Sequence, residues 1–102
     1  MYAWNISGDQ FAAYNAHLCG EERSAGTIEN YLRHVRTFAA WAGGRPVTRE
    51  LAAEWKAHLL TQDYAPVTIN AMLAALNGFF HFLGRDDCQV KFLKVQRRLF
   101  RD

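Results

Sequence analysis

The polar side chains of one stretch, residues 24–44, are of the types that bind DNA. Its first turns carry Thr27, Asn30 and Arg33, and Arg36 follows one turn later. Amides and hydroxyls read base edges in the major groove, whereas cations and short hydrogen-bond donors bind phosphate. These residues are therefore candidates for contacts with double-stranded DNA, although the same pattern also suits an ordinary solvated helix face.

The opposite side of this stretch predicts the helix that would position them. Apolar residues recur there at helical spacing, and Ser24 or Thr27 can cap the first turn. Gly43 and Gly44 end the predicted helix. The apolar stripe consists of Ile28, Tyr31, Leu32, Val35, Phe38, Ala39 and Trp41.

A second candidate pair, Thr68 and Asn70, lies in the cleanest helical pattern of the chain. This helix is expected to begin at Pro66 and to end at Gly84. Gly78 lies in its middle, where glycine costs roughly 1 kcal/mol relative to alanine. Its position favours close approach of another helix, and chance is the alternative. The apolar stripe consists of Ile69, Met72, Leu73, Leu76, Phe79, Phe80 and Leu83.

Two further helices complete the pattern. Ser7 and Gln10 have the spacing of a capping box that starts a first helix, which Gly20 is expected to stop. Thr48 is expected to cap a helix over 49–62. The exposed face of that helix has a mixed charge and no groove-binding character, with Glu50, Glu54, Lys56 and Gln62.

Four helices with short loops in 102 residues predict an all-α fold, a compact bundle that occupies residues 1–88. Beyond it, Val90, Phe92 and Leu93 fit no single period. Residues 89–102 are therefore expected to form an extended arm, with a short amphipathic helix as the alternative.

The distribution of charge singles out this arm. The net charge of the chain is only +2, but residues 91–101 contain five basic residues and no acidic ones. Basic tails of this kind commonly bind nucleic acid, and a solvated C-terminal face is an equally good interpretation. The candidate DNA-binding cations are Lys91, Lys94, Arg97 and Arg98.

The sequence contains no pattern that indicates catalysis, a metal site or a cofactor. Phosphate loops, H-E-x-x-H and G-x-S-x-G motifs are absent. Tyr14 and Tyr31 lie on apolar stripes and are expected in the core. Cys19 and Cys88 are expected to be unpaired, and without a signal peptide or membrane span the protein is expected in the cytoplasm.

Two motifs together resemble a known family. S-x-x-T-I-x-x-Y-L-x-x-V-x-x-F-x-x-W at 24–41 and P-V-T-I-N-A-M-L-A-A-L-N-G-F-F-H-F-L at 66–83 resemble the N-terminal, SAM-like core-binding domain of tyrosine recombinases, or phage-type integrases. The basic segment at 90–100 is similar to the linker that precedes their catalytic domain. The resemblance covers about 90 residues, and the order and spacing of the motifs carry it.

This resemblance implies a non-catalytic module that binds one side of a DNA core site. The second and fourth helices would approach the major groove through Thr27, Asn30, Thr68 and Asn70. The basic segment 89–102 would be a linker along the DNA backbone, leading to a catalytic domain that this chain lacks. The module alone is expected to be monomeric, and the full-length protein is expected to assemble on DNA for integration or excision.

The main alternative is a SAM-like protein–protein interaction module, because a fold does not determine a function. Exposed aromatic residues such as Trp4 or Phe100 would then form its contact patch. A small helix-turn-helix regulator is a third possibility, but the predicted helices are longer than that motif requires.

Overall fold

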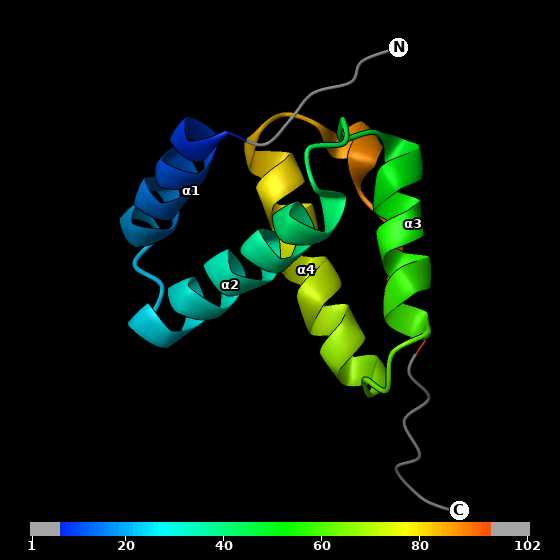
Figure 1. Cartoon of the computed structure of the whole chain (residues 1–102). Helices are drawn as coiled ribbons and strands as arrows, with labels where there is room; N and C mark the ends of the chain where they lie inside the picture. Colours follow the sequence, from blue (N-terminus) through cyan, green and yellow to red (C-terminus); the bar gives the residue numbers. More distant parts are fainter. Residues whose placement is uncertain (1–6, 95–102) are drawn as a thin grey trace, which may run out of the picture.

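The described part of the chain is an all-α bundle of four main helices, as the sequence predicted. The computed structural model describes residues 7–94. Figure 1 shows α2 crossing in front of α4, with α1 and α3 on opposite sides of this crossing. The elements are α1 (Gly8–Gly20), α2 (Ala25–Ala42), α3 (Arg49–Leu60), α4 (Pro66–Phe82) and a short 3-10 helix, η1 (Asp86–Cys88).

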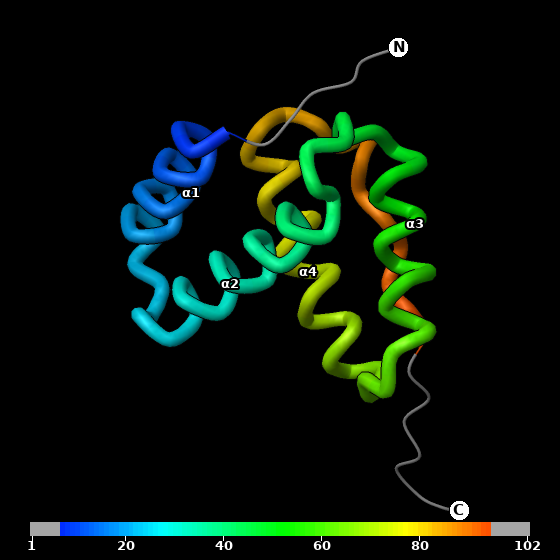
Figure 2. Tube along the Cα trace, viewed as in Figure 1, coloured from blue at the N-terminus to red at the C-terminus, as the bar shows by residue number. Residues whose placement is uncertain are grey.

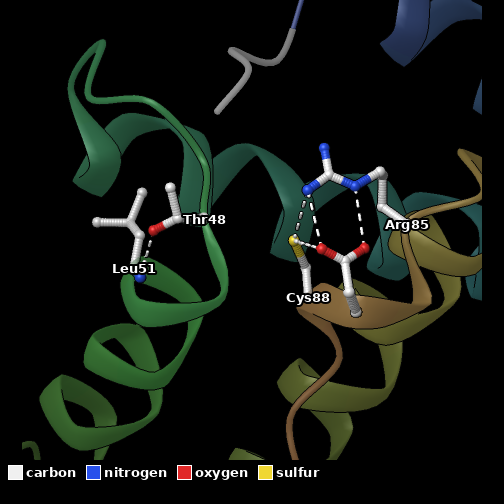
Figure 3. Close-up of polar contacts among 5 residues, drawn as sticks. Thr48, Leu51, Arg85 and Cys88 are labelled. Carbon is white, nitrogen blue, oxygen red and sulfur yellow. Dashed lines mark hydrogen bonds and ion pairs between the residues drawn. The ribbon is translucent and has the colours of Figure 1, made fainter. Parts of the chain in front are cut away.

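Local side-chain caps determine where the helices start. The capping box between Ser7 and Gln10 is present at α1, and Thr48 accepts a hydrogen bond from the Leu51 amide at α3 (Figure 3). At α2 the cap is Ser24, which decides between the two alternatives left open by the sequence. Helix α4 begins at Pro66 without a side-chain cap.

Left-handed residues follow the helix ends, with one departure from expectation. Gly43 (φ 59°) and Gly84 (φ 75°) take this conformation after α2 and α4. Gly20, however, is still the last residue of α1, and Glu22 (φ 60°) makes the left-handed turn instead. Helix α1 thus ends at Gly20 as predicted, but Gly20 is not its left-handed residue, and backbone hydrogen bonds from Glu21 and Glu22 close its last turn.

The core lies where α2, α3 and α4 meet. Phe38 of α2 is fully buried and makes edge-on ring contacts with Trp55 of α3 and Phe80 of α4. Helices α2 and α4 share the most extensive contact of any pair. The two predicted apolar stripes thus pack against each other and fix the outward faces of both helices.

Gly78 lets the Tyr14 side chain of α1 approach α4 closely, in agreement with its mid-helix position. A Cβ atom there would lie 2.9 Å from the Tyr14 hydroxyl and 3.8 Å from the Tyr31 ring. Tyr14 is itself buried and packs its ring on Phe79 and Phe82. Glycine at position 78 therefore makes room for a tyrosine from another helix.

A turn held by side-chain hydrogen bonds connects α4 to the arm. The guanidinium of Arg85 donates two hydrogen bonds, each 3.0 Å, to the carboxylate of Asp87, and it also points toward the buried Cys88 thiol (Figure 3). The bond from Arg85 lowers the pKa of the Asp87 carboxyl. Residues 89–94 then run without regular structure alongside α3 (Figure 2).

Candidate nucleic-acid interface

Helix α2 presents the predicted residues on its outward side, away from the Phe38 stripe. Asn30 and Arg33 are exposed, and within residues 7–94 neither side chain has a hydrogen-bond or ion-pair partner. Thr27 is half-buried, and its hydroxyl accepts a 2.9 Å hydrogen bond from Ser24. Asn30 and Arg33 are therefore available to a ligand, whereas Thr27 also supports the cap of its own helix.

His34 is next to Arg33 in the sequence, and its side chain is half-buried. Burial, together with the neighbouring Arg33 charge, lowers the pKa of its imidazole. The ring is consequently neutral over a wider pH range than an exposed histidine.

Stability is expected to fall as pH drops because of His34. Since its pKa is lower in the folded than in the unfolded state, the unfolded chain binds more protons below neutral pH. The effect is expected to be below about 1 kcal/mol, since the ring is partly solvated. Urea unfolding of wild type and His34→Gln at pH 7.5 and 5.0 checks this, and equal losses in both proteins would contradict it.

Helix α4 places its two predicted residues in different environments. Thr68 is exposed in the first turn. Asn70 is half-buried and engaged within the chain: its amide donates to the Leu93 carbonyl at 3.0 Å and accepts from the Leu93 amide at 2.7 Å. The sequence predicted Asn70 as a surface residue that contacts DNA and gave no sign of these bonds. In the structure the side chain holds Leu93 against α4.

Asn77 repeats the same arrangement two helical turns later. It donates to the Val90 carbonyl at 2.8 Å and accepts from the Val90 amide at 3.0 Å. Seven residues of helix rise about 10.5 Å, and three extended residues span about 10 Å. The spacing of the two asparagines therefore matches the spacing of Val90 and Leu93.

This pair of asparagines holds the described part of the arm, residues 89–94, against the bundle. Val90 and Leu93 also pack on the core, whereas Phe92 is 52% exposed. Lys91 and Lys94 are exposed and without partners in the described part of the chain. The other two predicted cations, Arg97 and Arg98, lie outside the described residues.

The predicted residues do not form one cluster. Figure 1 shows the first turn of α2 and the first turn of α4 at separate places on the molecule. Thr27 and Thr68 therefore mark two distinct surfaces, and the described lysines of the arm lie on a third segment.

The basic residues differ in whether their charged group already has a partner within the fold. Arg23 is paired with Glu21, and Arg45 with Glu54, while Arg36 stacks on the Phe11 ring between α1 and α2. Five cations of the 7–94 region have no such partner for their charged group: Arg33, Arg49, Lys56, Lys91 and Lys94.

Sequence reasoning missed Arg49, Lys56 and Asn77 as candidates. Arg49 and Lys56 alternate with Glu50 and Glu54 along α3, so the composition of the helix appeared mixed. Their spacing of seven residues, which puts both on one side of the helix, was the available signal.

The comparison with known families agrees with this architecture. The model of the phage integrase N-terminal SAM-like domain matches residues 11–87. These residues include α1 from Phe11 onward, all of α2, α3 and α4, and η1 up to Asp87. The chain belongs to this family.

A relative within the recombinases supports the membership. Tyrosine recombinase XerA of Thermococcus kodakarensis is 31% identical to this SAM-like domain over 74 residues. The match covers 72% of this chain but 26% of that recombinase, so the chain spans about a quarter of the relative's length. No solved structure matches the chain.

Within residues 7–94, no group of three potential metal ligands occurs, and no helix has the length and apolarity to cross a membrane. Cys19 and Cys88 form no disulfide within these residues. Burial raises the pKa of Tyr14 to about 12, so its phenol stays protonated at neutral pH.

Proposed function

We propose that this domain recognises one side of a DNA core site for a site-specific tyrosine recombinase. It would position a C-terminal catalytic domain of the same full-length chain for integration or excision. The domain itself carries out no chemistry in this proposal. Its partners are double-stranded DNA and that catalytic domain.

The observation that carries the proposal is the outward face of α2. Asn30 offers an amide and Arg33 a cation, both exposed and unpaired among the described residues, in a chain of the integrase family. Such an amide suits a base edge, and such a cation suits a phosphate or guanine. Thr27 and Thr68 supply further hydroxyls, and Lys91, Lys94, Arg97 and Arg98 would add phosphate contacts. Asn70 is left out of this set because it holds the arm.

The binding is expected to be weak and to depend on salt. Substituting Arg33→Gln should weaken binding to a short duplex several-fold at moderate salt and reduce the slope of log K against log salt by about 0.9. The measurement is fluorescence anisotropy over a salt series. Arg36 is left out of the proposed contact set, because its guanidinium stacks on the Phe11 ring on the α1 side of the helix. Arg36→Gln is therefore the matched control, since it removes the same charge from the same helix.

Amide-shift NMR with a random duplex gives the location independently. Shifts that fade with salt are expected around 27–33, at the first turn of α4 and in the arm. Binding that is indifferent to salt, or shifts confined to the arm, would count against the proposed role of the helix faces.

The second candidate function is protein–protein interaction, which exposed apolar residues would support. Leu60, Tyr64 and Val67, at the α3–α4 connection, are 55%, 45% and 61% exposed. Trp4 and Phe100, which the sequence suggested for such a patch, lie outside the described residues. Self-association that survives neutral substitution of Lys91 and Lys94 but is lost in Val67→Ser would favour this function.

A further inference from the structure

An open groove of about 310 Å³ lies between α3 and the arm. Its basic lining residues are Arg49 and Lys56 from the helix and Lys91 from the arm, and Ala53 contributes only a methyl group. Arg49, Ala53 and Lys56 stand at i, i+4 and i+7, so they share one side of α3. Among the residues that the structure describes, no acidic side chain lines the groove.

The three cations are not neutralised within the fold. Within residues 7–94, none of them has an ion-pair partner. The acidic residues of α3 point elsewhere: Glu54 pairs with Arg45 at 3.8 Å, and Glu50 is next to Arg49 in sequence, about 100° around the helix. Three like charges around a small depression leave a concentrated positive potential that favours an anion.

The arm is held in place to form one wall of this groove. Val90 is bonded to Asn77 through both its amide and its carbonyl, and the Gln89 side chain donates to the Asn77 carbonyl at 3.2 Å. The two residues that precede Lys91 are thereby fixed on α4. Asn77 is thus a positioning residue for Lys91.

We propose that this groove, which contains Arg49, Lys56 and Lys91, binds a phosphate of the DNA backbone. The inference rests on the proposed DNA-binding function and adds α3 to the surfaces that contact DNA. It revises the sequence-based expectation that α3 has no groove-binding character. A phosphodiester group suits this groove because it is small and carries one negative charge. Arginine and lysine both bind phosphate oxygens.

Salt dependence of binding to a short duplex tests the groove. Each of Arg49→Gln and Lys56→Gln is expected to reduce the slope of log K against log salt by about 0.9, and the double variant by about 1.8. Arg36→Gln is the matched control, since it removes one charge from the α1 side and should leave the slope nearly unchanged. Far-UV circular dichroism establishes that all the variants are folded.

A double-mutant cycle tests the positioning role. In the wild-type background Lys91→Gln should weaken binding about three-fold at moderate salt, whereas in Asn77→Ala the same change should have a smaller effect. Equal effects in both backgrounds would overturn the role assigned to Asn77.

The outcomes separate the two proposals. Absence of wild-type binding at low salt would overturn the DNA-binding function itself. Binding with an unchanged salt slope in Arg49→Gln and Lys56→Gln would overturn the groove alone. Equal losses in Arg36→Gln would also overturn it, because the effect would then be one of net charge.

Discussion

Replacing Gly78 with leucine is expected to destabilise the domain by about 3 kcal/mol, which overpacking of a buried contact can cost. Even a Cβ atom at this position would lie 2.9 Å from the Tyr14 hydroxyl. Tyr14 cannot easily yield, since its ring is buried and packed on Phe79 and Phe82. Chemical unfolding followed by circular dichroism would measure the loss.

A graded series distinguishes steric conflict from helix propensity. Gly78→Ala gains roughly 1 kcal/mol of propensity but must displace Tyr14, so a net loss of about 1 kcal/mol is expected. Gly26→Ala is the matched control, because a Cβ atom at that helical position meets nothing within 4 Å. If both alanine variants were stabilised equally, the close approach at Gly78 would not constrain the fold.

The same glycine shows why much of the fold could be predicted from the sequence. A glycine inside an otherwise regular helix is costly, so its presence indicated a neighbour before any neighbour was known. Caps such as Ser7–Gln10 and Thr48 were predictable for a similar reason, since all their partners lie within three residues. Local rules determine these features.

The roles of Asn70 and Asn77 could not be predicted in this way. Their partners are backbone groups 23 and 13 residues away, and a backbone amide or carbonyl leaves no trace in the sequence. An asparagine on a polar helix face is compatible with water, a base edge or another segment of the chain. Only the position of the arm decides among these.

In the candidate site, too, some features follow from local sequence and others only from tertiary contacts. The outward direction of Asn30 and Arg33 followed from the helical period of the α2 stripe, and the structure has both exposed. The basic groove did not follow from any single segment, because its cations come from α3 and from the arm. A site assembled from distant segments requires the tertiary contact that assembles it.

Removing the asparagine anchors is the second change with a large expected effect. Asn77→Ala deletes two hydrogen bonds to Val90, and Asn70→Ala deletes two to Leu93. Since these backbone groups are half-buried, each variant is expected to lose about 1–2 kcal/mol of unfolding free energy. Asn30→Ala is the control, as that exposed amide has no partner within residues 7–94.

Aspartate at either anchor separates hydrogen bonding from packing. Asn77→Asp keeps the size of the side chain and still accepts from the Val90 amide, but at neutral pH it can no longer donate to the Val90 carbonyl. A carboxylate facing that carbonyl is expected to cost at least as much as alanine does. An Asn77→Asp variant as stable as wild type would show that the donated bond contributes nothing.

Amide hydrogen exchange would test the order in which the two anchors release residues 89–94. The turn at Arg85–Cys88 fixes the start of the arm, so the arm should detach from its far end first. In Asn70→Ala the Leu93 amide should lose protection while the Val90 amide keeps it, whereas in the double variant both should exchange freely. Loss of Val90 protection in Asn70→Ala alone would mean that the two anchors act as one unit. Sequential release would mean instead that Asn77 alone suffices to hold Lys91 beside α3.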